Sequence, residues 1–144
     1  MDDEFHFELP IEVRFRDIDA MGHVNNAVYF SYMEQARIGY MRTVGLMPDR
    51  LNETSFILAE ATCQFKAPVP FGMSLVVKVR VSALRHSSFL MEYRIEERGA
   101  QRLMALGRTI NVAYDYAAGK SMPILTDWRA KIEQFEGNGS LADR

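Results

Sequence analysis

The chain has 144 residues, of which 48% are apolar and 25% are charged, and its formal net charge is −2. This length and composition are typical of one folded domain and exclude an intrinsically disordered chain. A net charge near zero, without a run of Lys or Arg, does not favour a nucleic-acid-binding protein. We therefore expect a single domain over residues 1–144, with a core at about 8–136 and loose termini.

The single cysteine, Cys63, rules out an intrachain disulfide framework and fits a reducing cytoplasm. The N-terminal sequence MDDEFHFELP is acidic and lacks the long apolar run of a signal peptide. No segment reaches the ~18 uninterrupted apolar residues of a membrane-spanning helix. We expect a cytoplasmic protein that neither spans a membrane nor binds nucleic acid.

A first strand is predicted near the N-terminus by the alternation of apolar and polar residues, which places the apolar set on one face. The apolar members of this alternation are Leu9, Ile11, Val13 and Phe15. Pro10 suits an edge strand or the start of a strand. Residues 16–26 are expected to form an irregular loop.

A long helix is predicted from about Ala27 to Val44, with Gly45 as its C-cap. Its apolar residues cover most of the circumference, which is typical of a buried helix. At a rise of ~1.5 Å per residue it spans about 27 Å, enough to cross a small domain. Within it, Glu34 is predicted to be buried and paired with Arg37 at position i+3.

Alternating patterns predict four further strands, over 55–67, 73–84, 88–97 and 102–116. In the last of them, Gly107 is expected at a β-bulge. The apolar set of that strand is Met104, Leu106, Ile110, Val112 and Tyr114.

A short amphipathic helix over about 126–136, with Thr126 as N-cap, ends the ordered chain. The element order predicts an α+β fold, a curved antiparallel sheet of about five strands wrapped around the long helix. Such a sheet leaves long edges, which proteins usually cover or pair. We therefore expect two chains to associate.

The loop before the long helix, FRDIDAMGHVNN, concentrates polar residues at the helix start. The first N–H groups of a helix have no internal acceptor and carry partial positive charge. At a buried helix such donors can hold an oxyanion, and a carboxylate of Asp17 or Asp19 can act as nucleophile or general base. Acyl transfer or hydrolysis is the favoured reaction class. Ordinary loop and capping chemistry, with Asn25 and Asn26 at the helix start, explains the same residues and stays open at this point.

The three histidines, His6, His23 and His86, are scattered, and with one cysteine they offer no metal-binding spacing. We expect neither a metal nor a cofactor. Cys63 is predicted to be a small core residue. The motif Gly-x-Ser-x-Gly of serine hydrolases is absent.

The segment RDIDAMGHVNNAVYFSYMEQAR resembles the start of the hotdog-fold acyl-CoA thioesterases of the 4-hydroxybenzoyl-CoA thioesterase and YbgC type. That family has the turn Asp-x-x-Gly, then His-Val-Asn-Asn or a variant, then Tyr-x-x-Tyr-x-Glu-x-Ala-Arg. The segments ILAEATCQFKAPVPFG and ALRHSSFLMEYRI are similar to the strand and hairpin that follow. The resemblance covers about residues 8–116 and implies a hotdog fold, with a sheet wrapped on one long central helix.

The resemblance also implies an activity, the hydrolysis of a fatty or aromatic acyl-CoA. Asp19, three residues before Gly22, matches the family's catalytic aspartate, which leaves Asp17 as a turn residue. The backbone N–H that polarises the carbonyl matches Asn26, and Gly22 lets the turn approach. His23 is a further catalytic candidate. Asp19 either attacks the carbonyl, forming an anhydride, or activates water.

Binding residues are implied in the same way, with the acyl group expected between the central helix and the sheet. Candidates for the acyl substrate are Gly22, Asn25, Tyr29, Phe30 and Met33. Candidates for the phosphates of coenzyme A are Arg85, His86 and Ser87. A homodimer or homotetramer is expected. Two alternatives remain: an acyl-carrier-protein thioesterase, and a non-catalytic module that binds or senses acyl-CoA.

Overall fold

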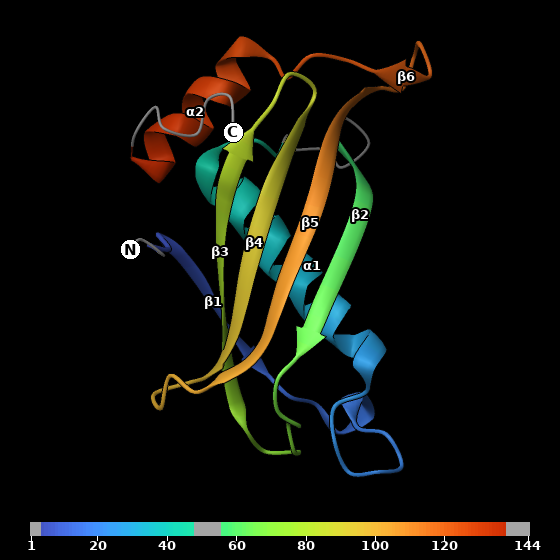
Figure 1. Ribbon diagram of the computed structural model, residues 1–144, viewed down its shortest axis with the longest axis vertical. Helices are drawn as coiled ribbons and strands as arrows, with labels where there is room; N and C mark the ends of the chain where they lie inside the picture. Colours follow the sequence, from blue (N-terminus) through green and yellow to red (C-terminus); the bar gives the residue numbers. More distant parts are fainter. Residues whose placement is uncertain (1–3, 48–55, 138–144) are drawn as a thin grey trace.

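A computed structural model of the chain describes residues 4–47 and 56–137. Its elements in chain order are β1 (Phe7–Glu12), the 3-10 turn η1 (Phe15–Asp17), α1 (Asn26–Val44), β2 (Phe56–Phe65), β3 (Ser74–Leu84), β4 (Ser88–Glu97), β5 (Leu103–Asp115), β6 (Lys120–Ser121) and α2 (Thr126–Glu136). The main strands form one antiparallel sheet in the order β1-β3-β4-β5-β2, and the short β6 pairs with β5. α1 crosses one face of this sheet, and α2 lies near the C-terminal end of α1 (Figure 1). The predicted sheet, long helix and C-terminal helix are thus confirmed.

The ends of α1 follow from capping groups in the sequence. The Asn25 carboxamide accepts the Ala27 N–H at 2.9 Å, and Gly45, at φ 92°, donates its N–H to the last carbonyls of the helix. The predicted C-cap at Gly45 is therefore confirmed. The prediction for α2 was wrong by one residue, because Thr126 is the first helical residue and Leu125, which has no capping side chain, holds the N-cap position.

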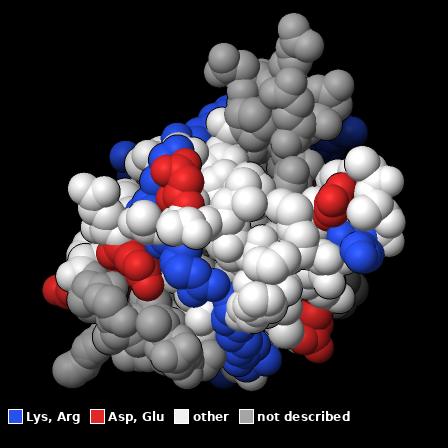
Figure 2. All heavy atoms as spheres, turned by 90° about the horizontal axis from the view of Figure 1, so that it is seen from above, with Lys and Arg blue, Asp and Glu red and all other residues white. Residues whose placement is uncertain are grey.

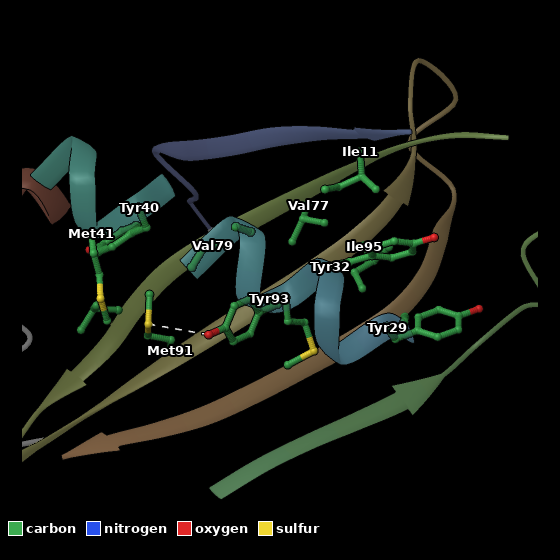
Figure 3. Packing of buried hydrophobic residues seen from close by; sticks show 14 of the residues in the cluster. Ile11, Tyr29, Tyr32, Tyr40, Met41, Val77, Val79, Met91, Tyr93 and Ile95 are labelled. Carbon is green, nitrogen blue, oxygen red and sulfur yellow. Dashed lines mark hydrogen bonds between the residues drawn. The ribbon is translucent and has the colours of Figure 1, made fainter. Parts of the chain in front are cut away.

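The core lies between one face of α1 and the inner face of the sheet (Figure 3). The buried residues of α1 are Tyr29, Tyr32, Met33, Ala36, Tyr40 and Met41. They pack against buried side chains of β3 and β4 such as Val77, Val79, Met91, Tyr93 and Ile95. In the part of the chain that the structure describes, the buried residues of α1 lie on one face, so the prediction of burial nearly all round was wrong.

Glu34 lies on the uncovered side of α1, where it is exposed. Its predicted pairing with Arg37 is not among the contacts of the described residues. Instead, Arg37 Nη1 donates to the hydroxyl oxygen of Tyr93 at 3.2 Å. The guanidinium is drawn toward the sheet because the buried Tyr93 hydroxyl offers an acceptor there.

Met33 is fully buried and packs against Gly107 of β5. A Cβ atom built on Gly107 would lie 2.7 Å from both Sδ and Cε of Met33. The glycine therefore allows α1 to lie close to the sheet. It is not a bulge, as was predicted, because its pairs with Tyr93 and Cys63 continue in register.

The face of β5 was also predicted wrongly. Its buried members are Met104, Ala105, Thr109, Asn111 and Ala113, whereas the larger apolar residues Leu106, Ile110, Val112 and Tyr114 are only partly buried. Thr109 and Asn111 turn inward because each finds a hydrogen-bond partner there. The Thr109 hydroxyl lies 2.8 Å from the Tyr93 hydroxyl and accepts the Asn111 carboxamide at 3.2 Å.

The first strand ends earlier than expected. β1 stops at Glu12, and Phe15 stands in η1 with 79% of its surface exposed, its ring against that of Phe71. Among the described residues, no helix is long and apolar enough to cross a membrane.

Met33→Ala should lower the free energy of unfolding by ~2–5 kcal/mol, because the cavity beneath α1 cannot be filled by its close-packed neighbours. Urea denaturation would measure this loss. Ile38→Ala, on the half-buried side of the same helix, is the control and should cost less. Equal losses for the two variants would contradict the close contact between α1 and β5.

Candidate active site

The loop between η1 and α1 folds back on itself as a short antiparallel ladder. The Asp17 carbonyl accepts the Asn25 N–H at 2.9 Å. Two residues further in, the Asp19 N–H donates to the His23 carbonyl at 2.9 Å. Gly22 closes the turn by donating its N–H to the Asp19 carbonyl at 3.0 Å, with the positive φ of 85° that favours glycine. Asp19 and the start of α1 are therefore held on the two arms of one loop.

A second segment packs against this loop. Val24 donates its N–H to the Val69 carbonyl at 2.8 Å, and His23 forms a β-bridge with Pro70. The residues that follow β2 are thus held beside the start of α1.

A hollow of about 380 Å³ opens between these segments. It is lined by Asp19, Met21, His23, Val24, Asn26, Tyr29, Phe65, Lys66, Ala67 and Pro68. The structure thus brings together four residues that were predicted to lie in the site: Asp19, His23, Asn26 and Tyr29. Its inner wall is aromatic, since the Tyr29 and Phe65 rings meet edge to face at 4.9 Å.

Asp19 presents a carboxylate that is only partly engaged. Its Oδ1 accepts the Met21 N–H at 2.9 Å, while Oδ2 accepts no hydrogen bond from the described residues. The Asn25 carboxamide caps the Ala27 N–H and not that of Asn26. In the described part of the chain the Asn26 N–H has no acceptor, as expected for the first residue of a helix. Asp19, whose carboxylate is half engaged, and Asn26, whose N–H begins the helix, therefore both line one hollow.

Asp17 has a different setting, since it is buried and does not line the hollow. Its Oδ2 accepts the Arg14 N–H at 2.9 Å and the Tyr32 hydroxyl at 2.7 Å. Its Oδ1 lies 3.4 Å from the Arg14 guanidinium. Burial by itself would raise the pKa of Asp17, but these hydrogen bonds and the charge of Arg14 lower it below the usual value.

The remaining candidates for the acyl substrate lie around the hollow or beneath it. Gly22 and Asn25 flank it in the loop. Phe30 is half-buried on α1, and Met33 is fully buried in the core; neither lines the hollow.

Burial raises the pKa of Cys63 to about 11, so its thiol stays protonated at neutral pH and is a poor nucleophile.

The candidates for the phosphates of coenzyme A are not near the hollow within this chain. Arg85, His86 and Ser87 form the turn between β3 and β4, at the opposite end of the sheet from the loop that carries Asp19 (Figure 1). Arg129 of α2 joins this turn by donating to the Arg85 carbonyl at 2.5 Å. Seen from this end, Lys and Arg side chains form a band across the surface (Figure 2).

Sequence reasoning missed Phe65, the last residue of β2, and Lys66, which follows it; both line the hollow. A signal was present in the break after them, because the two prolines of APVPFG end the strand. What the sequence does not contain is the pairing of β2 with β5, which carries this strand end to the start of α1.

A further hollow, of about 360 Å³, includes Arg80, Glu92, Arg94 and Arg108 on the other face of the sheet. The Arg80 guanidinium pairs with Glu92 at 2.7 Å, and Arg94 pairs with Glu96 at 2.9 Å. The first pair joins β3 to β4 and the second lies within β4, and such ion pairs are ordinary for a solvated sheet face. This hollow lacks a helix N-terminus and is the weaker candidate for chemistry.

Asp17→Asn should reduce stability at neutral pH by ~1–3 kcal/mol, since a charged acceptor of buried donors is lost. The pKa of Asp17 is lower in the folded than in the unfolded chain, so its contribution is present above about pH 4 and is lost as pH falls through the lowered folded pKa. Unfolding free energies of both proteins, measured from neutral to acid pH, should therefore converge. If the difference in unfolding free energy between the two proteins stayed constant from neutral to acid pH, the stabilising role of the Asp17 carboxylate would be contradicted.

Comparison with known proteins gives consistent matches. A family model described as "Thioesterase-like superfamily" matches residues 13–132. A thioesterase from Thermus thermophilus, solved with coenzyme A and zinc, superposes with a TM-score of 0.83 at 34% identity, covering 95% of this chain and 99% of that one. The acyl-CoA thioesterase YbgC of Haemophilus influenzae is 28% identical over 121 residues, 82% of this chain and 86% of the relative.

A plant relative matches over a shorter stretch. The chloroplastic acyl-acyl carrier protein thioesterase ATL2 of Arabidopsis thaliana is 37% identical over 82 residues, which are 56% of this chain. The alignment spans 43% of the plant protein, less than half of its length.

Proposed function

The chain belongs to the thioesterase-like superfamily and has the hotdog fold that its sequence predicts, and we propose that it hydrolyses the thioester bond of an acyl-CoA to a free acid and coenzyme A. The observation that supports this activity best is the hollow whose lining includes both Asp19 and Asn26, the first residue of α1. The sequence similarity to acyl-CoA thioesterase YbgC over 82% of the chain points the same way.

In the proposed mechanism, the thioester carbonyl accepts a hydrogen bond from the Asn26 N–H, at the positive end of α1. This donor stabilises negative charge as it develops on the carbonyl oxygen. Asp19 Oδ2 either attacks the carbonyl carbon, giving an acyl-aspartyl anhydride that water then cleaves, or removes a proton from the attacking water. In both routes the carbon–sulfur bond breaks and coenzyme A leaves as a thiolate. His23, at the rim of the hollow, is the candidate to protonate it.

The other lining residues suit the two ends of such a substrate. The Tyr29 and Phe65 rings offer an apolar wall to the acyl group. Lys66 places a cation beside the hollow, where it can attract the phosphate of a pantetheine arm. Met33 packs tightly against Gly107 and leaves no space beneath α1 at that point. We therefore assign the acyl group to the surface formed by the Tyr29 and Phe65 rings.

Asp19→Asn should fold normally and lose ~10²–10⁴-fold in turnover, because the amide can neither attack nor accept a proton. Thiol release from short, long and aromatic acyl-CoAs would measure this. Asp115→Asn is a matched control, since Asp115 Oδ1 likewise accepts the N–H of the residue two positions on, Ala117, at 3.0 Å. Near-wild-type turnover in the Asp19 variant would refute the assignment.

A second candidate activity is hydrolysis of an acyl group carried on acyl carrier protein. It is favoured by the 37% identity with the plant thioesterase ATL2 over a stretch of 82 residues. The pantetheine arm and its phosphate are shared by both substrates, so the hollow suits either. Parallel assays with one acyl group on coenzyme A and on a carrier protein would separate them by their values of kcat/KM.

We also propose that the protein acts in the cytoplasm as a homodimer or a homotetramer built on a homodimer. Among the described strands, β5 is the one neighbour of β2 in the sheet, and the other edge of β2 is the one we propose to pair. Antiparallel pairing of two β2 edges would bring the β3–β4 turn of the partner level with the hollow. Within one chain the β3–β4 turn and the hollow lie at opposite ends of the sheet, and β3, at ~3.3 Å per residue, is roughly 35 Å long. Pairing with a second chain would remove this separation. Arg85, His86 and Ser87 would then bind the phosphates of coenzyme A held by the neighbouring chain.

A complementation experiment tests whether one site combines Asp19 of one chain with Arg85 of the other. Chains with Asp19→Asn and chains with Arg85→Ala should both be poor enzymes at low substrate concentration. A mixed dimer would hold one site in which Asp19 and Arg85 are both intact, so kcat/KM should recover to about half the wild-type value per dimer. No recovery in purified, doubly tagged mixed dimers would mean that the two residues do not serve one site across the interface.

A further inference from the structure

Asp17 joins three parts of the chain at one buried point. Its carboxylate accepts the backbone N–H of Arg14, before η1, and the hydroxyl of Tyr32, inside α1. Its carbonyl accepts the N–H of Asn25, the N-cap of α1. The residue is 2% exposed, so these contacts are shielded from water. The strand end, the loop and the helix are therefore held by a single side chain and its backbone.

The Tyr32 hydroxyl is the one contact among these that comes from the body of α1. Tyr32 is also 2% exposed and lies beside Tyr29 in the core (Figure 3). Neither Tyr32 nor Asp17 lines the hollow, so neither touches a substrate there. Burial and the neighbouring Asp17 carboxylate raise the pKa of Tyr32, which keeps its hydroxyl protonated as a donor.

From these contacts we propose that Tyr32 and Asp17 form a positioning pair that sets the Asp19 carboxylate against the Asn26 N–H. Asp19 follows Asp17 by two residues, and Asn26 follows Asn25 directly. The two reacting groups therefore sit on the two chain segments that Asp17 ties together. The inference rests on the proposed thioesterase function and assigns residues beyond those that touch the substrate.

The same helix carries a matched pair at its other end. Tyr40 donates its hydroxyl to Glu136 Oε2 at 2.5 Å, and that oxygen also accepts the Val81 N–H at 3.0 Å. Both pairs join a buried tyrosine of α1 to a carboxylate that also accepts a backbone N–H. The Tyr40 pair docks α2 onto the sheet and lies away from the hollow, so it separates a positioning effect from a loss of stability.

Tyr32→Phe should lower kcat by ~10–100-fold and leave KM within about threefold of the wild-type value, because small misplacements of reacting groups are costly. Tyr40→Phe should leave both constants near those of the wild type. Each assay is run well below the melting temperature of each variant, with folding checked by circular dichroism. Equal kcat values for the two variants would overturn the inference.

Two further measurements keep the test decisive if Tyr32→Phe folds poorly. Asp17→Asn retains an acceptor oxygen and should keep more of kcat than Asp17→Ala, at similar KM. In Tyr32→Phe or Asp17→Asn, amide hydrogen exchange at Asp19 and Asn25 should accelerate, whereas Tyr40→Phe should leave it unchanged. Unaltered exchange at both amides would also overturn the inference.

The exchange readout does not depend on turnover. If wild-type protein released no thiol from any acyl-CoA, the proposed function would fail, while the positioning of the loop by Tyr32 and Asp17 would still be tested.

Discussion

The close contact between Met33 of α1 and Gly107 of β5 lets the middle of the helix pack closely on the sheet. No other residue at position 107 would let the thioether lie where it does without a shift of the neighbouring atoms. Because an α-helix is a stiff rod, fixing its middle also fixes where its first turn stands. The position of the Asn26 N–H therefore depends on a packing contact two turns away from it.

Around that contact, buried polar side chains have hydrogen-bond partners. On the sheet, the buried Tyr93 hydroxyl lies 2.8 Å from the Thr109 hydroxyl and accepts a hydrogen bond from the half-buried Arg37 of α1. At the helix start, Tyr32 and Asp17 form a buried hydrogen-bonded pair. Buried polar groups stabilise one arrangement over its alternatives when each has a partner. This explains how a loop of small and polar residues stays ordered at the end of an apolar helix.

The sequence alone predicts a large part of this structure. The ends of α1 follow from local capping groups at Asn25 and Gly45, and the strands follow from their alternation. The family resemblance points to Asp19, Gly22 and Asn26 in one loop, and Asp19 and Asn26 do line the same hollow.

What the sequence does not predict depends on contacts between distant segments. The inward face of β5 carries Thr109 and Asn111, and the alternation of apolar residues points the wrong way because the hydroxyl of Tyr93 supplies a partner. Glu34 is exposed in the single chain, although a helix so rich in apolar residues suggests burial. Lys66 and Phe65 join the hollow only through the pairing of β2 with β5.

In the proposed mechanism, the thioester carbonyl lies at the N-terminus of α1, opposite Asp19. Infrared difference spectroscopy of an acyl-CoA with a ¹³C-labelled carbonyl, bound to the slow Asp19→Asn protein, tests this directly. A hydrogen bond from the Asn26 N–H polarises the carbonyl, so its stretching frequency should fall below the value of the free substrate in water. A frequency equal to or above that of the free substrate would contradict the placement of the substrate at this helix.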